Sequence, residues 1–262
     1  MLYLFFWLEA AIVTAALYLA PIGLHPALIL PILIGAFLAF NLFHVLYLMI
    51  SSALLSKKQP ERPHRLPLLT VRLSLPWVAT MLGIRVRAKG KEKLPKTHTV
   101  YVANHRSAFD PVFIMSAFPR TKTAFVSKMS VSKYPFVGPY MNACGYVFVD
   151  RESPMQSMRA IHRAAKYVRE NKMNYGIFPE GTRAKDENLL PFKSGAFALA
   201  KKADVPITVI AIRGSEKAFS FRFPRVTVTA LDVIPVEDVR ALTVDELAER
   251  ARAMIETALS AR

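Results

Sequence analysis

Two long apolar stretches near the N-terminus constrain the fold of this chain most. Residues 2–24 contain Glu9 as their single charged side chain, and residues 27–50 are apolar again. A helix rises about 1.5 Å per residue, so each stretch is long enough to cross a hydrocarbon core of roughly 30 Å. We therefore expect residues 1–56 to form a membrane-anchoring two-helix hairpin.

Charge begins where the apolar stretches end. The first Lys or Arg is Lys57, so all 35 Lys and Arg residues belong to residues 57–262. The net charge of +16 therefore comes from this part of the chain. Basic flanks of membrane segments stay in the cytoplasm, which predicts a cytoplasmic domain at the inner membrane. A spanning hairpin and a re-entrant hairpin predict the same side. Residues 57–83 suit either an interfacial helix or a core helix of the domain.

From Ile84 onwards, strand patterns alternate with helical patterns. The expected strands are 84–89, 99–103, 123–127, 145–149, 175–178, 207–212 and 226–231, and the expected helices are 111–117, 154–170, 194–203 and 243–259. This alternation predicts an α/β domain with a mixed β-sheet and flanking helices. Thr243 and Glu246 are spaced as a capping box for the last helix. Cys144, the single cysteine, lies in an apolar run and is expected in the core.

The strand predicted over 99–103 leads into a turn that contains His105. Asp110, followed by Pro111, suits the start of the next helix. The Asp110 carboxylate would hold one imidazole nitrogen and leave the other free to accept a proton, as a general base requires. A purely structural capping role for Asp110 is the alternative. Ser107 is expected to hydrogen bond within the turn.

Polar residues follow several predicted strands, at the ends where α/β sheets bind their ligands. They include Asn104 to Asp110 after one strand and Arg151 after another. Glu180, Gly181, Thr182 and Arg183 follow a third. Arg151, Arg183 and Lys193 would make a shared crevice cationic and suited to phosphate. Gly181 would let backbone amides approach the ligand closely.

Four short motifs follow one another along the chain. They are Asn-His-x-Ser-x-x-Asp at 104–110, Gly-Tyr-Val-Phe-Val-Asp-Arg at 145–151, Phe-Pro-Glu-Gly-Thr-Arg at 178–183 and Val-Pro-Ile at 205–207. In this order they resemble the motifs of the glycerolipid acyltransferase family, which includes the 1-acylglycerol-3-phosphate O-acyltransferases. The resemblance covers roughly residues 85–215, and the apolar front is similar to the two-helix anchor of bacterial members.

The resemblance implies transfer of a fatty acyl group from an acyl thioester to the sn-2 hydroxyl of lysophosphatidate, which gives phosphatidate. His105 would be the general base, oriented by Asp110, and no acyl-enzyme would form. The implied substrate-binding residues are Asn104, Ser107, Lys128, Arg151, Glu180, Gly181, Thr182, Arg183, Lys193 and Pro206, the last beside the acyl donor. The donor would be acyl-CoA or acyl–acyl carrier protein, and the other partners would be membrane phospholipids. Neither a cofactor nor a metal ion is expected.

Three alternatives remain open at this point. Acylation of glycerol 3-phosphate or of another lysophospholipid would use the same His105–Asp110 pair. A membrane-tethered nucleic-acid binder would explain the basic charge, but the basic residues form no recognisable binding motif, so no nucleic-acid partner is expected. A hydrolase with Ser107 as nucleophile would use water as the acceptor.

Overall fold

The structure is a computed structural model that describes residues 29–261 except 57, 82, 120, 151, 172, 185–187 and 219–223. The second predicted apolar stretch forms helix α2, Ile29–Ala53. The first stretch lies outside the described residues. The structure therefore shows one N-terminal apolar helix and does not show the predicted two-helix hairpin. Within the described part of the chain, α2 is the one helix long and apolar enough to cross a membrane.

A seven-stranded mixed sheet forms the centre of the domain, in the order β1-β7-β6-β2-β5-β3-β4. The strands are β1 Arg85–Lys89, β2 Val100–Ala103, β3 Thr123–Lys128, β4 Val147–Val149, β5 Asn174–Ile177, β6 Ile207–Arg213 and β7 Arg225–Ile234. Neighbours from β6 to β4 are parallel, whereas β7 is antiparallel to β6 and parallel to β1. The predicted mixed sheet is confirmed.

Burial follows the position of each strand in the sheet. All four residues of β2 and the first six of β6 are buried, as expected for central strands covered on both faces. The edge strand β1 instead alternates exposed and half-buried residues, because one of its faces is open.

The strands from β6 to β4 run parallel, so their C-terminal ends share one edge of the sheet. This edge, called the carboxyl edge below, is formed by β6, β2, β5, β3 and β4.

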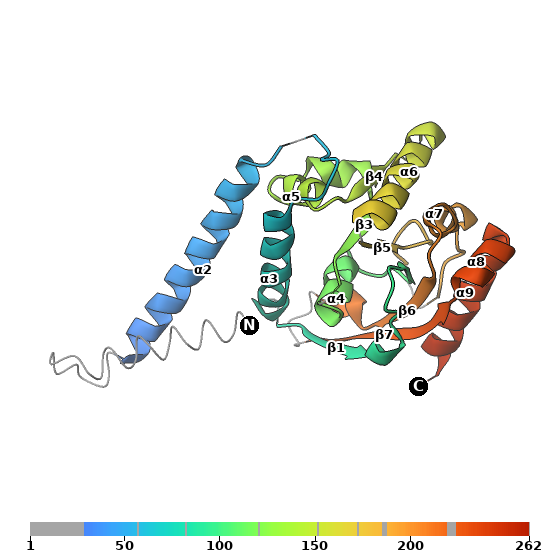
Figure 1. Ribbon diagram of the computed structural model, residues 1–262. Coiled ribbons are helices and arrows are strands. Elements are labelled where there is room, and N and C mark those ends of the chain that lie inside the picture. The colour runs from blue at the N-terminus through green and yellow to red at the C-terminus, as the bar shows by residue number, and fades with distance from the viewer. Residues whose placement is uncertain are drawn as a thin grey trace.

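Helices cover both faces of the sheet (Figure 1). Helices α3 (Arg65–Met81) and α4 (Asp110–Ala117) lie on one side, and α6 (Pro154–Asn171), α7 (Ala198–Ala203) and α9 (Val244–Ser260) lie on the other. The short helices α5 (Val137–Ala143) and α8 (Val236–Ala241) were not predicted, since neither is long enough to show a clear helical period. The capping box of α9 is confirmed: Thr243 Oγ1 accepts the Glu246 N–H at 3.2 Å.

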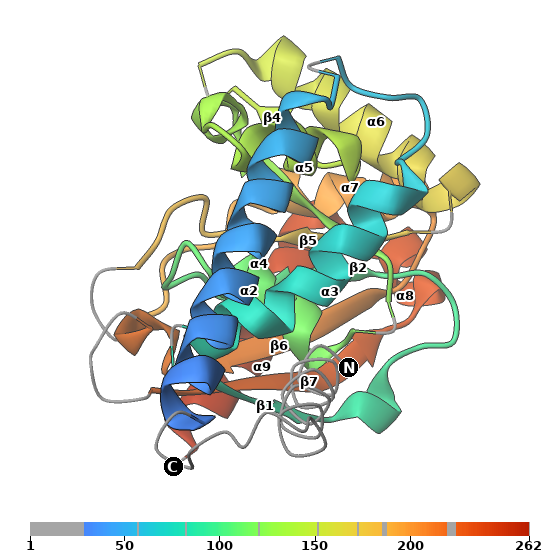
Figure 2. The same ribbon diagram turned by 90° about the vertical axis from the view of Figure 1, so that its left-hand side faces the viewer.

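Helix α3 lies between α2 and the sheet (Figures 1 and 2). The hydroxyl oxygens of Tyr47 and Thr70 are 3.1 Å apart, and Ser74 Oγ lies 3.2 Å from His44 Nε2. Both α3 partners are buried, while Leu66, Leu69 and Leu73 of the same helix are exposed. The predicted interfacial stretch is therefore a helix with one face packed in the protein and one apolar face open.

Gly176 in β5 leaves room for an aromatic ring from β3. A Cβ atom here would lie 2.0 Å from Cε1 of Phe125, whose side chain is buried. Gly176→Ala is therefore expected to lower the free energy of unfolding by about 1–3 kcal/mol through overpacking. Gly195→Ala is the control, because no described atom beyond its chain neighbours lies within 4 Å of its Cβ position. Denaturant unfolding in detergent compares them, and equal stabilities would contradict the prediction.

Candidate active site

A histidine and a buried aspartate meet at the carboxyl edge of the sheet. His105 follows β2, and its Nδ1 lies 2.8 Å from Oδ2 of Asp110, the first residue of α4. The His105 side chain is 19% exposed and that of Asp110 is 0% exposed. The carboxylate holds Nδ1, which leaves Nε2 as the ring nitrogen that can accept a proton from a ligand.

The Asp110 carboxylate also closes the turn that carries His105. Its Oδ2 accepts the backbone N–H groups of Arg106 at 2.7 Å and Ser107 at 2.8 Å. The Ser107 hydroxyl is buried in the same turn, where its oxygen accepts the Phe109 N–H at 3.3 Å. Asp110 therefore has both a structural and an orienting role, and the N-cap of α4 is Phe109 instead.

Two aromatic rings stack behind the imidazole. The ring centroids of His105 and Phe178 are 4.3 Å apart, and those of Phe178 and Phe125 are 5.8 Å apart. These rings were not predicted as part of the site, because in the sequence each resembles an ordinary strand residue. Their placement depends on β5 lying between β2 and β3. The stack restricts the orientation of the His105 ring on the face that Phe178 covers.

Glu180 lies beneath the same turn with 3% of its surface exposed. Its Oε1 accepts the His105 N–H at 2.7 Å, and its Oε2 accepts the Leu190 N–H at 3.2 Å. Burial raises the pKa of the Glu180 carboxyl, and these two backbone N–H groups act in the opposite direction. Both oxygens are thus engaged by the backbone, which gives Glu180 a supporting position in the turn, and its contact with the substrate stays a prediction.

Two further predicted binding residues take structural positions. The Asn104 amide donates to the Ile212 carbonyl at 2.9 Å and accepts the Ile212 N–H at 2.8 Å, so it ties β2 to β6. Pro206 precedes β6 and accepts the Val100 N–H at 3.0 Å. It therefore lies at the amino edge of the parallel strands, the length of β2 away from His105. The structure thus separates Pro206 from the His105–Asp110 pair, and its place beside the acyl donor stays a prediction.

Exposed cations lie at the same carboxyl edge as the pair. Lys128 ends β3, and Arg183 and Thr182 lie exposed in the turn after β5. Gly181 in this turn has φ 71°, and a Cβ atom there would lie 3.2 Å from Nζ of Lys193. The structure thus brings Lys193 over the Gly181 turn. Arg151, also predicted for this crevice, lies outside the described residues.

Arg106 is a cation that the sequence analysis did not single out. Its side chain is 14% exposed, and its guanidinium lies 3.8 Å from the carboxylate of Glu216, in the turn that follows β6. This ion pair links the loops after β2 and β6. Among the residues that the structure describes, no group of three His, Cys, Asp or Glu side chains is placed to hold a metal ion.

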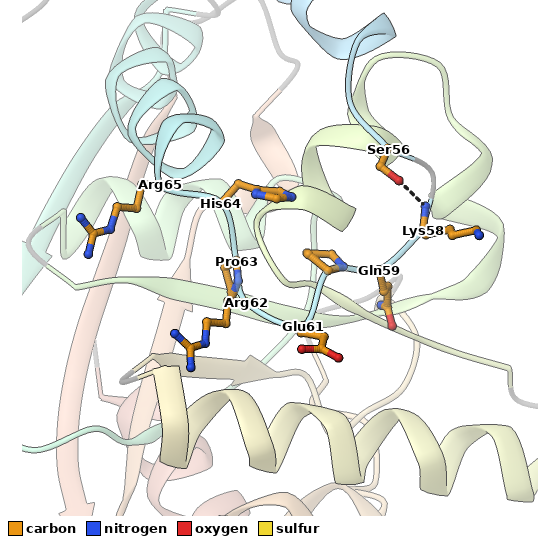
Figure 3. Close-up of a pocket in the computed structure, with 9 residues that line it drawn as sticks. Ser56, Lys58, Gln59, Glu61, Arg62, Pro63, His64 and Arg65 are labelled. Atoms are coloured by element: carbon orange, nitrogen blue, oxygen red, sulfur yellow. Dashed lines mark hydrogen bonds between the residues drawn. The ribbon is translucent and has the colours of Figure 1, made fainter.

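An open cavity of about 610 Å³ lies elsewhere, on the segment that joins α2 to α3 (Figure 3). It is lined by Ser56, Lys58, Gln59, Pro60, Glu61, Arg62, Pro63, His64 and Arg65. The Arg62 and Arg65 side chains extend to one side of the segment and Lys58 to the other (Figure 3). The cavity does not include the His105–Asp110 pair, and it presents basic groups next to the end of α2.

Residues 85–213, from β1 to the end of β6, match the family model described as Acyltransferase. This part of the chain is an acyltransferase-family domain. The matched residues include the His105–Asp110 pair, the turn after β5 and the strands that bring them together.

Individual acyltransferases are also similar to this chain. It is 30% identical over 198 residues to the 1-acyl-sn-glycerol-3-phosphate acyltransferase of Saccharomyces cerevisiae, covering 73% of this chain and 65% of that protein. It is 31% identical over 162 residues to the enzyme of that name from Limnanthes douglasii, covering 61% and 57%. The chain thus spans less than two thirds of the length of these relatives.

A solved structure agrees with the fold. The 1-acyl-sn-glycerophosphate (LPA) acyltransferase PlsC from Thermotoga maritima superposes with a TM-score of 0.57 at 26% sequence identity. The match covers 74% of this chain and 80% of that structure. It supports the assignment of the mixed sheet and its helices to an acyltransferase.

The two backbone hydrogen bonds that Glu180 accepts have a testable consequence for stability. Glu180→Gln places an amide N–H₂ opposite a backbone N–H, so one buried donor loses its acceptor. We expect a loss of about 1–3 kcal/mol in the free energy of unfolding. Glu249→Gln, the same change at an exposed position of α9, is the control and should stay within about 0.5 kcal/mol. Denaturant titration measures both, and an unchanged free energy of unfolding in Glu180→Gln would contradict a stabilising role of these hydrogen bonds.

Proposed function

We propose that this acyltransferase transfers a fatty acyl group from an acyl thioester to the sn-2 hydroxyl of lysophosphatidate, giving phosphatidate. The observation that carries the proposal is the hydrogen-bonded His105–Asp110 pair at the carboxyl edge, with exposed cations around it. The names of the similar acyltransferases support lysophosphatidate as the acceptor.

The proposed mechanism is direct acyl transfer. His105 Nε2 takes the proton of the acceptor hydroxyl as its oxygen attacks the thioester carbonyl carbon. The resulting imidazolium is stabilised by the buried Asp110 carboxylate at Nδ1. When the carbon–sulfur bond breaks, the thiolate leaves and the imidazolium returns the proton to it. The Ser107 hydroxyl is held within the turn, which favours direct transfer over an acyl-serine intermediate.

The acceptor phosphate would be bound by the cations of the carboxyl edge. Lys193 lies over the Gly181 turn, and exposed Arg183 follows in the same turn, so both cations are close to the backbone amides that would face a phosphate. Thr182 supplies a hydroxyl in this turn, and Lys128 approaches from β3. We include Arg151 in the set on the strength of its motif. The same charge suits the anionic donors, acyl-CoA or acyl–acyl carrier protein.

The proposed domain arrangement places residues 1–56 in the membrane as an anchor and residues 57–262 in the cytoplasm as the catalytic domain. The apolar side chains of α2 are open to the surroundings, as a lipid-facing helix requires. The basic residues that follow α2 favour the cytoplasmic face of the inner membrane.

Removal of the proposed base tests the reaction. His105→Ala is expected to lower the rate of acyl transfer at least about 100-fold. His162→Ala, a change of the same kind at an exposed position of α6, should leave the rate within twofold. The assay uses purified full-length protein, long-chain acyl-CoA, and lysophosphatidate, glycerol 3-phosphate or neutral lysolipid as acceptor. A His105→Ala rate within tenfold of wild type would refute the mechanism, and preference for another acceptor would change the substrate.

The phosphate assignment is tested at Arg183. Arg183→Ala should raise the KM for lysophosphatidate about tenfold, because a charged hydrogen bond contributes about 1.5 kcal/mol or more. The KM for the acyl donor should change little. Arg250→Ala on α9, also an exposed arginine, serves as the control. Equal weakening of donor and acceptor would show that Arg183 does not bind the acceptor selectively.

A further inference from the structure

A short segment that follows β3 and ends at the first residue of α5 exposes three large apolar side chains. Tyr134 is 56% exposed, Phe136 43% and Val137 51%. The backbone hydrogen bonds of the neighbouring residues hold the segment in place, since the Gly138 N–H donates to the Tyr134 carbonyl at 2.9 Å. We propose that this segment, the 134–137 loop, inserts into the head-group region of the bilayer as a second membrane contact. The proposal rests on the membrane attachment of α2 proposed above.

The backbone of the loop is strained at its aromatic tip. Phe136 has φ 62° and ψ −46°, and the Val137 N–H donates to the Pro135 carbonyl at 2.7 Å, which makes a γ-turn. Such a turn is rare and costly for a residue other than glycine. Because the Phe136 ring stays partly open to the surroundings, burial within the protein offsets little of this cost. A lipid contact gives the exposed ring an apolar environment.

The loop is joined to the C-terminal end of α2. Ser52 Oγ donates to the Phe136 carbonyl at 3.0 Å, and the hydroxyl oxygens of Ser51 and Tyr140 are 2.5 Å apart. Figures 1 and 2 both show α5 beside this end of α2. The last turns of α2 expose Met49 and Ile50, and Leu54, directly after the helix, is exposed as well. The apolar surface of α2 therefore continues onto the catalytic domain through the loop.

The charges near the loop fit an anionic lipid surface. Lys128 and Lys133 are the charged residues of the sequence 128–137, and both are exposed. The segment after α2 adds exposed Lys58, Arg62 and Arg65. Basic side chains attract anionic head groups, and tyrosine is favoured at the membrane–water interface. The occupant that fits both features is a bilayer containing anionic lipid.

This contact would position the catalytic edge of the domain. The chain enters the loop from the end of β3, and β3 neighbours β5, which in turn neighbours β2. The loop therefore leaves the same edge of the sheet that carries His105. Insertion here would bring the crevice next to the leaflet that supplies a lipid acceptor.

A fluorescent probe at Phe136 tests the contact. Phe136→Cys is labelled with a thiol-reactive environment-sensitive dye in full-length protein, reconstituted in phosphatidylcholine–phosphatidylglycerol vesicles. Burial raises the pKa of the native Cys144 thiol to about 12, so this thiol should remain unlabelled. Leu42→Cys on α2 and Glu249→Cys on α9 are the lipid and water controls. Quenching is measured with doxyl-labelled lipids and with aqueous iodide.

The outcomes separate the loop from the anchor. We expect the probes at 42 and 136 to be quenched at least twofold more by doxyl lipids than the probe at 249, with the opposite order for iodide. Quenching of the 136 probe by iodide alone would overturn the loop contact while leaving the α2 anchor intact. Failure at 42 as well would instead refute the anchor. Shielding at 136 that disappears in nanodiscs with one protein copy would assign the loop to self-association and overturn the proposal.

A functional comparison gives an independent readout. The variant Tyr134→Ser/Phe136→Gly/Val137→Ser removes the apolar side chains. Glycine adopts the positive φ of position 136 without strain, so backbone strain should not lower the thermal midpoint of this variant. Its turnover of lysophosphatidate in vesicles should drop at least threefold, with turnover in detergent micelles unchanged. Leucine at the same three positions should restore vesicle turnover. Equal vesicle turnover for the serine–glycine and leucine variants would overturn the proposal.

Discussion

The parallel pairing of β2 with β5 is the constraint on which the site depends. Tyr101 pairs with Gly176 in the middle of the two strands, so the chain leaves both at the same edge. The turn that carries His105 then meets the turn after β5, although 75 residues separate His105 from Glu180. Gly176 is required here because Phe125 occupies the space above it. The same ring stack continues through Phe178 to the imidazole.

The acidic and basic groups of the site have different physical roles. Asp110 and Glu180 are buried. Oδ2 of Asp110 and both oxygens of Glu180 accept hydrogen bonds from backbone N–H groups, so these carboxylates fix the backbone around His105. Buried carboxylates in this position are stable because these donors replace lost water. Arg183 and Lys193 are exposed. In the proposed mechanism the buried acids orient His105, and the exposed cations are available to an anionic substrate.

Helix α2 joins α3 and the α5 region through polar contacts. Tyr47 and His44 meet α3, and Ser51 and Ser52 meet the α5 region, so the apolar remainder of α2 stays open. The hydroxyl and imidazole groups on this face of an otherwise apolar helix form hydrogen bonds with partners in the protein. Such bonds are stronger where the groups are partly buried. This division fits a helix held by a catalytic domain on one face and by lipid on the other.

The sequence by itself determined the local features: the strand positions, the capping box of α9, and the turn that pairs His105 with Asp110. These depend on residues a few positions apart, so periodicity and turn chemistry reveal them. Tertiary structure decided the strand order, and with it the roles of Asn104, Glu180 and Pro206. A motif shows that polar residues occur together, but only strand pairing determines whether a side chain meets a ligand, a distant backbone group or the opposite edge of the sheet.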